Sequence, residues 1–177
     1  MTAIPCGNKM GVPTQWKIDG TPMFETLLSL LEKESARFRV IAHPAEGKSE
    51  EVARLRGTLP GQGAKAMLCK SRDTAGGYVL AILSGDRKLD FRKVAQAADF
   101  RKATLASPEE AMQATGCVIG AIPPFSFSPD ILLIADPDLV AGHTEIAFNA
   151  GCLDRSIVLD TQDYLRIAQP RLHALCA

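Results

Sequence analysis

The stretch from Ser107 to Pro124 carries two strong local patterns that fix where the chain starts a helix and where it turns. Ser107-Pro108-Glu109-Glu110 is a capping box, with serine as N-cap, proline at the first helical position and glutamate at the third. The helix should end at Gly116. Thr115 to Pro124, TGCVIGAIPP, then sets two glycines and a proline pair in an apolar run. Glycines allow close approach of a ligand and prolines stiffen the exit, so this segment is either a wall of a site or an ordinary loop.

The apolar periodicity along the chain predicts short helices and strands in an irregular order. Thr21 and Thr161 are expected N-caps, and residues 136–138 are a turn or a short helix start. Helices are expected over residues 21–35, 49–56, 89–98, 107–116 and 161–167. Strands are expected over residues 38–43, 64–70, 78–84, 102–105, 131–135, 145–149 and 156–159, the second and third forming a hairpin.

This order lacks the strict alternation of strand and helix that is typical of a doubly wound fold. It predicts the α+β class, with a curved, mostly antiparallel mixed sheet of about six or seven strands, barrel-like and surrounded by about four or five helices. Residues 1–20 are expected to be an N-terminal arm and residues 21–177 a single domain, since 177 residues can bury a substantial core.

Composition and cysteine content exclude several classes of protein. Hydrophobic residues at 46% and charged residues at 23% are ordinary for a soluble globular chain, and neither a membrane-spanning run nor a secretion signal is present, which predicts a cytoplasmic location without membrane contact. The cysteines are odd in number and scattered, which argues against disulfides and against a metal site, and no cofactor is expected. They are Cys6, Cys69, Cys117, Cys152 and Cys176.

Charge is balanced overall but uneven along the chain. The sequence has 20 basic and 20 acidic residues, yet residues 54–102 hold 11 Lys or Arg against 4 Asp or Glu. Such a segment is either the solvated face of amphipathic elements or a patch that contacts phosphates.

Three motifs in order resemble the YbaK/ProX family of aminoacyl-tRNA deacylases, the free-standing relatives of the editing domain of bacterial prolyl-tRNA synthetases. They are Gly63-Ala64-Lys65-Ala66-Met67-Leu68 at the start of a hairpin, Thr115 to Pro124 after the capped helix, and Asn149-Ala150-Gly151 before Ser156-Ile157-Val158-Leu159. The resemblance covers roughly residues 21–167 and implies a mixed sheet wrapped by helices.

The resemblance implies a set of site residues. Lys65 stands at the family's characteristic lysine, and Gly120 to Pro124 matches its GxxxP signature against the aminoacyl ester, so Lys65 and Gly120 are the expected catalytic residues. Ala66 replaces the polar residue that follows the lysine in many members, which leaves the substrate open. The expected substrate-binding residues are Gly116, Ala121, Ile122, Pro124, Asp136, Asn149 and Gly151.

The implied chemistry is hydrolysis of an activated ester, for which a site must hold the carbonyl, supply donors to the oxyanion and place a water. Backbone amides near Gly120 could donate, and Lys65 suits an electrostatic role, although a strand-edge lysine facing solvent is the ordinary alternative. Cys117 suggests a thiol nucleophile but is more typical of a small buried hydrophobe. Asp136 could orient a water or the substrate amine, or simply cap a helix.

The expected function is therefore trans-editing of a mischarged aminoacyl-tRNA, of the Cys-tRNA(Pro) or Ala-tRNA(Pro) type. The expected partner is the acceptor end of aminoacylated tRNA, with a prolyl-tRNA synthetase as a further candidate and the oligomeric state left open. Two alternatives remain, namely a catalytically idle module of the same fold that binds tRNA or a synthetase, and a thiol enzyme that uses Cys117.

Overall fold

The computed structural model describes residues 2–5, 22–73 and 77–177. The expected cap Thr21 and most of the N-terminal arm lie outside these ranges. The helices are α2 (Pro22–Lys33), α3 (Ser49–Arg56), α4 (Phe91–Ala98), α5 (Pro108–Thr115), α6 (Pro137–Gly142) and α7 (Thr161–Ala168), with a 3-10 turn η1 at Pro60–Gln62. The strands are β1 (Thr2–Pro5), β2 (Phe38–Ala42), β3 (Ala64–Ser71), β4 (Tyr78–Ser84), β5 (Ala103–Leu105), β6 (Ile131–Ala135), β7 (Glu145–Asn149), β8 (Arg155–Asp160) and β9 (Arg171–Leu172).

Local sequence patterns account for several helix ends. The Ser107 hydroxyl accepts from the Glu110 amide while the Glu110 side chain accepts from the Ser107 amide, which confirms the capping box. Gly116 ends α5 in the left-handed region at φ 72°. The expected cap at Thr161 is wrong by one residue, because the Asp160 carboxylate accepts from Asp163 and caps α7.

Within the described ranges the strands form two sheets rather than one. The first has the order β1-β2-β8-β7 and is antiparallel throughout, and the second has the order β5-β3-β4-β6-β9. In the second sheet β3–β4 is the expected antiparallel hairpin, whereas β4–β6 and β6–β9 are parallel. The α+β class is therefore confirmed, but the described strands do not close into a barrel.

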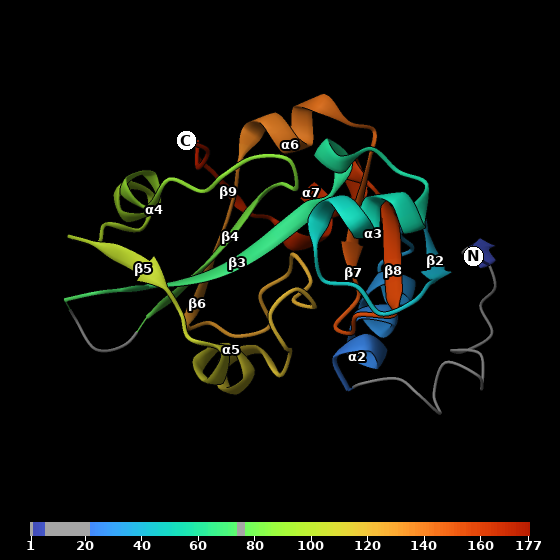
Figure 1. The fold of residues 1–177 in the computed structure, drawn as a ribbon, viewed down its shortest axis with the longest axis horizontal. Helices are drawn as coiled ribbons and strands as arrows, with labels where there is room; N and C mark the ends of the chain where they lie inside the picture. The colour runs from blue at the N-terminus through green and yellow to red at the C-terminus, as the bar shows by residue number, and fades with distance from the viewer. Residues whose placement is uncertain (1, 6–21, 74–76) are drawn as a thin grey trace.

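The two sheets meet at one edge of each. A parallel bridge joins Gly63, just before β3, to Ala147 on β7. Figure 1 shows β3 running from α4 and β5 toward α3 and β7, with α5 below and α6 above. The junction of the sheets therefore brings the start of β3, the end of β7 and α3 together.

The core is apolar and fills the space around this junction. α2 buries one face through Phe24, Leu27, Leu28 and Leu31 at helical spacing. β8 is buried along most of its length, and Ile82, Phe148 and Ile157 are at most 1% exposed. Among the described residues, no helix is both long and apolar enough to cross a bilayer.

Candidate functional site

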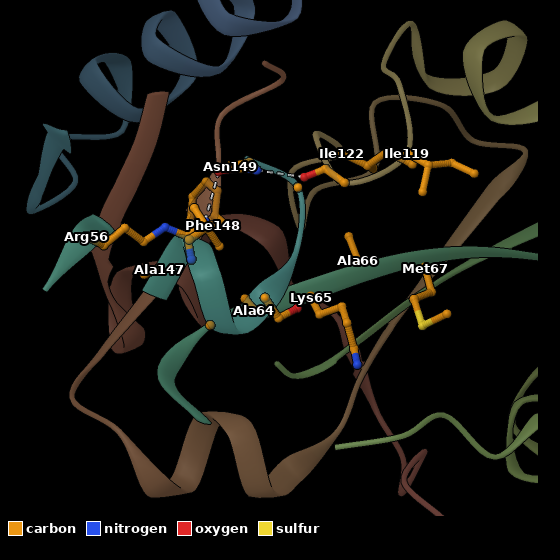
Figure 2. A pocket seen from close by; sticks show the side chains of 15 residues that line it. Arg56, Ala64, Lys65, Ala66, Met67, Ile119, Ile122, Ala147, Phe148 and Asn149 are labelled. Atoms are coloured by element: carbon orange, nitrogen blue, oxygen red, sulfur yellow. Dashed lines mark hydrogen bonds between the residues drawn. The ribbon is translucent and has the colours of Figure 1, made fainter. Parts of the chain in front are cut away.

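A cavity of about 200 Å³ lies at the junction of the two sheets. Its walls come from the segment before and along α3, the start of β3, the loop after α5 and the end of β7 (Figure 2). The lining residues are Gly47, Ser49, Val52, Arg56, Gly63, Ala64, Lys65, Ala66, Met67, Ile119, Gly120, Ile122, Ala147, Phe148 and Asn149. The structure thus brings Lys65, Gly120, Ile122 and Asn149 of the expected set to one cavity.

The loop after α5 crosses a second loop at two glycines. Gly120 has φ 91°, and a Cβ built there would lie 3.1 Å from the Gly47 Cα and 3.3 Å from its carbonyl oxygen. The positive φ and the close backbone approach thus require glycine at position 120, whereas a Cβ on Gly47 would make only ordinary contacts, the nearest with the Leu153 Cδ2 at 3.5 Å. The amides of Gly120 and Ile122 donate to no acceptor within the described part of the chain. These two N–H groups are available to a bound carbonyl or oxyanion.

Asn149 fastens the two loops together from the end of β7. Its side-chain amide nitrogen donates to the Glu46 carbonyl and to the Gly120 carbonyl, each at 2.9 Å. At 5% exposure, Asn149 holds these carbonyls where water cannot easily replace it. Asn149 thereby fixes the position of Gly120 in the cavity wall.

Beyond the cavity, the proline end of the loop is anchored in the core. The Tyr164 hydroxyl of α7 donates to the Pro124 carbonyl at 2.8 Å. The Phe125 ring packs edge-on against Tyr164 and Phe148, with centroids 5.4 Å and 6.0 Å apart. Pro124 therefore stiffens the loop from behind rather than lining the cavity.

A buried polar network lies behind Asn149. The Arg56 Nε donates to the Ser156 hydroxyl at 2.7 Å, and the Arg56 Nη2 donates to the Asn149 side-chain oxygen Oδ1 at 3.0 Å. His43 contacts the same hydroxyl through Nε2 at 2.7 Å and the Pro44 carbonyl through Nδ1 at 2.8 Å. Burial lowers the pKa of Arg56 to about 10, so it stays charged at neutral pH.

Lys65 enters the cavity wall by its stem rather than by its ammonium group. Figure 2 shows its side chain leaving β3 on the side opposite to Ala66, which points toward Ile119 and Ile122. The Nζ donates to the Arg87 carbonyl at 2.6 Å. Burial lowers the pKa of Lys65, and the nearby Asp86 acts in the opposite direction. Lys65 is half-buried and bonded, unlike a lysine that simply faces solvent.

The other expected binding residues lie outside the cavity lining, and their proposed contacts with substrate stay predictions. Gly116 caps α5, and the Ala121 carbonyl accepts from the Gly151 amide at 2.9 Å. A Cβ on Gly151 would lie 2.7 Å from the Met23 Cγ, so helix α2 requires this glycine. Asp136 caps α6 and accepts from the Leu175 and Cys176 amides at 2.8 Å and 3.2 Å.

Cys117 is enclosed in the core. It is 1% exposed, its Sγ donates to the Thr115 carbonyl at 3.6 Å, and burial raises the pKa of its thiol. A thiolate nucleophile needs exposure and a lowered pKa, so this environment disfavours the thiol mechanism.

Comparison with known proteins identifies the family. The model of the aminoacyl-tRNA editing domain matches residues 43–167. The multifunctional Ser/Thr-tRNA deacylase ProXp-y of Escherichia coli (strain K12) is 51% identical over 154 residues, covering 86% of this chain and 92% of that protein. The chain belongs to the aminoacyl-tRNA editing domain family. This confirms the resemblance to YbaK/ProX proteins, and the protein is an enzyme of the aminoacyl-tRNA deacylase class.

Two further matches fit the same family. A proline–tRNA ligase of Geobacillus sp. (strain WCH70) is 33% identical over 93 residues, which are 52% of this chain and 16% of that protein. A solved structure proposed to be a trans-editing enzyme for prolyl-tRNA synthetase has a TM-score of 0.75 at 23% identity, covering 90% of this chain and 99% of that one. This structural likeness shows that the editing-domain fold is shared.

Sequence reasoning did not place Arg56, Ser156 or His43 in the polar network beside the cavity, although Ser156 belongs to the third motif, and it did not predict the crossing at Gly47. One signal was available for Arg56, because it lies four residues after Val52 and therefore on the buried face of α3. A charged residue on an apolar helix face indicates a buried polar contact. Ser156 and His43 carry no such local signal.

The network makes the stability of this editing domain dependent on the neutral form of His43. Burial lowers the pKa of His43 below its ordinary value, and Arg56 acts in the same direction. The unfolded chain therefore binds a proton more readily, so the free energy of unfolding should fall as pH drops below about 6.5. Urea titrations at pH 7.5 and pH 5.5 should show a larger loss for the wild type than for His43→Gln.

His143→Gln serves as the matched control, since His143 lies outside the network, and it should keep the full acid-dependent loss. Equal losses in the wild type and His43→Gln would contradict the assignment.

Proposed function

We propose that this protein hydrolyses, in trans, the ester that joins a small mischarged amino acid to the 3′ end of tRNA. The observation that carries the proposal is one small cavity bordered by Lys65, Gly120 and Ile122, where the amides of Gly120 and Ile122 donate to no acceptor among the described residues. Its volume of about 200 Å³ suits a small aminoacyl group rather than a bulky one.

The reaction requires little covalent chemistry from the protein. A water attacks the ester carbonyl, the tetrahedral intermediate expels the ribose oxygen, and free amino acid and uncharged tRNA are released. The amides of Gly120 and Ile122 would donate to the carbonyl oxygen as negative charge develops on it. Their fixed positions, held by Asn149 and by Tyr164 behind the loop, favour such donation without rearrangement.

Lys65 would act electrostatically rather than as a nucleophile. Its contact with the Arg87 carbonyl uses one of the three N–H groups of an ammonium and leaves two for substrate. A role as general base would need a free amine, which donation to a carbonyl disfavours. Because its stem rather than its ammonium group lines the cavity, contact of the ammonium with the terminal phosphate of the tRNA is the role that its position supports.

Serine and threonine are the amino acids that we propose first. The 51% identical relative is described as a Ser/Thr-tRNA deacylase. The cavity lining combines apolar residues with polar side chains, among them Arg56 and Ser49, which suits a small side chain with a polar end. Removal of alanine or cysteine from tRNA(Pro), expected from the family resemblance alone, stays a prediction for the same assay.

A basic surface near β5 suits the tRNA body. Arg72, Arg101 and Lys102 are exposed, and the Arg72 amide donates to the Lys102 carbonyl at 2.9 Å, which brings these neighbours together. Clustered exposed cations of this kind bind phosphate backbones independently of sequence. A substrate used in translation also favours the cytoplasm, and the likeness to proline–tRNA ligases favours a synthetase as partner.

Deacylation assays on a panel of aminoacyl-tRNAs test this function. The wild type should release serine, threonine or both, whereas Lys65→Ala should lose about 100-fold in rate because an electrostatic contact that positions the substrate is removed. Lys33→Ala, at an exposed lysine at the end of α2, should match the wild type. A folded wild-type protein that hydrolyses no member of the panel, including alanyl- and cysteinyl-tRNA(Pro), would refute the proposal in favour of an idle binding module.

A further inference from the structure

Arg56 is a buried cation in the wall of the cavity. Its side chain is 8% exposed, and none of the described carboxylates lies within ion-pair distance of it. Its two hydrogen-bond acceptors, Ser156 Oγ and Asn149 Oδ1, are neutral. A buried guanidinium normally has its charge and its donors matched by the protein. In this cavity, the described part of the protein satisfies only some of the N–H donors of Arg56 and supplies no opposite charge.

Most of the N–H groups of the Arg56 guanidinium are not used by the described residues and remain free to donate to a bound ligand. A guanidinium has five N–H groups, and these two bonds use one on Nε and one on Nη2, so three have no acceptor in the described part of the chain. The Nη1 lies 3.8 Å from the position of a Cβ on Gly63, another lining residue. Figure 2 shows the Arg56 side chain reaching toward Ala147 and Phe148 on β7.

The two polar side chains that accept from Arg56, namely Asn149 and Ser156, have no N–H or O–H group left to donate to a ligand. Both N–H groups of Asn149 are used by the Glu46 and Gly120 carbonyls. The Ser156 hydroxyl hydrogen points either to His43 Nε2 or to Asn149 Oδ1, because both atoms contact that oxygen. Arg56 therefore holds the spare donors of this network, and the group that it receives must be a hydrogen-bond acceptor.

The charge of Arg56 selects which part of an aminoacyl ester fits. The α-ammonium group of the substrate is repelled by a guanidinium, so it cannot lie on this side of the cavity. A phosphodiester is too large to reach a side chain that is 8% exposed in a cavity of about 200 Å³. The lining also includes the apolar Ala64, Ala147 and Phe148, and Ser49 at the start of α3. A short side chain that ends in a hydroxyl meets both requirements.

We propose that Arg56 is the specificity-determining residue of this site and donates a hydrogen bond to the side-chain hydroxyl of a seryl or threonyl ester. This inference rests on the proposed deacylase function and adds how the site recognises the side chain of the amino acid. An alanyl ester would leave buried donors unpaired, and such sites discriminate strongly against analogues that lack the polar atom.

Arg56→Met tests the assignment, because methionine keeps much of the side-chain length without donors. The single-turnover rate for seryl-tRNA, divided by that for alanyl-tRNA on the same tRNA, should fall about 10- to 100-fold in the variant. Arg155→Met is the matched control. Arg155 is also buried, at 4% exposure, but stacks on Phe24 at 4.9 Å outside the cavity lining. Its seryl-to-alanyl ratio should stay at the wild-type value.

Binding of uncleavable analogues gives a second measurement that needs no variant. Adenosine carrying a 3′-amide-linked serine should bind the wild type at least about tenfold more tightly than the alanine analogue. Equal binding of both analogues, or an equal loss of seryl and alanyl turnover in Arg56→Met, would overturn the role of Arg56 while leaving the deacylase function intact. A wild type without any deacylase activity would remove both proposals.

Discussion

Gly120→Ala should reduce deacylation about 100-fold or more, because it displaces a backbone donor from the ester carbonyl. Two effects act together at this position. The φ of 91° is strained for alanine, and the added Cβ would lie 3.1 Å from the Gly47 Cα, where no flexible side chain can move aside. The crossing of the two loops must therefore widen, and the Gly120 and Ile122 amides move with it. Single-turnover hydrolysis of seryl-tRNA measures the effect.

Gly77→Ala is the control that separates the effect of backbone strain at a positive φ from the effect of displacing the loop at Gly120. Gly77 has φ 82°, close to that of Gly120, but a Cβ there meets no atom within 4 Å among the described residues. This variant should lose only about 1–2 kcal/mol of stability and keep wild-type hydrolysis. Full activity in Gly120→Ala would mean that the loop position does not govern the chemistry.

Asn149→Ala should lower the free energy of unfolding by about 2–4 kcal/mol, since it leaves several buried polar groups without partners at once. The Glu46 and Gly120 carbonyls lose their donor, and Arg56 and Ser156 lose the acceptor Oδ1. The two loops that form one cavity wall are no longer tied together, so hydrolysis should fall as well. Urea unfolding followed by circular dichroism gives the stability.

Gln96→Ala is the matched control for loss of a side-chain amide, because Gln96 is exposed on α4. Its free energy of unfolding should stay within about 0.5 kcal/mol of the wild type. If Asn149→Ala had an equally small effect, the hydrogen bonds by which Asn149 joins the two loops would contribute little to the free energy of unfolding.

Local patterns located most elements correctly because their hydrogen bonds form within a few residues. The capping box at Ser107 and the left-handed cap at Gly116 depend on neighbours three to four residues away, and the β3–β4 hairpin joins two strands that are close in the sequence. The Thr161 cap failed for a related reason. Asp160 offers the stronger acceptor one position earlier, while the Thr161 hydroxyl donates to the distant His143 carbonyl instead.

The division into two sheets was beyond such patterns. Apolar alternation predicts that a segment is a strand, but not which strand pairs with it or in which direction. The parallel pairing of β4 with β6, and the bridge between Gly63 and Ala147, depend on how distant segments pack. A single barrel-like sheet was therefore a reasonable but incomplete expectation.

By itself, the sequence determined the α+β class, the family and the Gly/Pro loop with Gly120 at its centre. Only the tertiary structure decided what that loop faces, namely Gly47 across a close backbone crossing and Asn149 at the end of β7. It also turned Arg56 into a site residue, through hydrogen bonds to partners 93 and 100 residues away. Such contacts follow from the packing of the two sheets, which no short stretch of sequence encodes. In the mechanism that we propose, the loop supplies the donors for the ester, and the packing of the two sheets supplies the polar wall beside it.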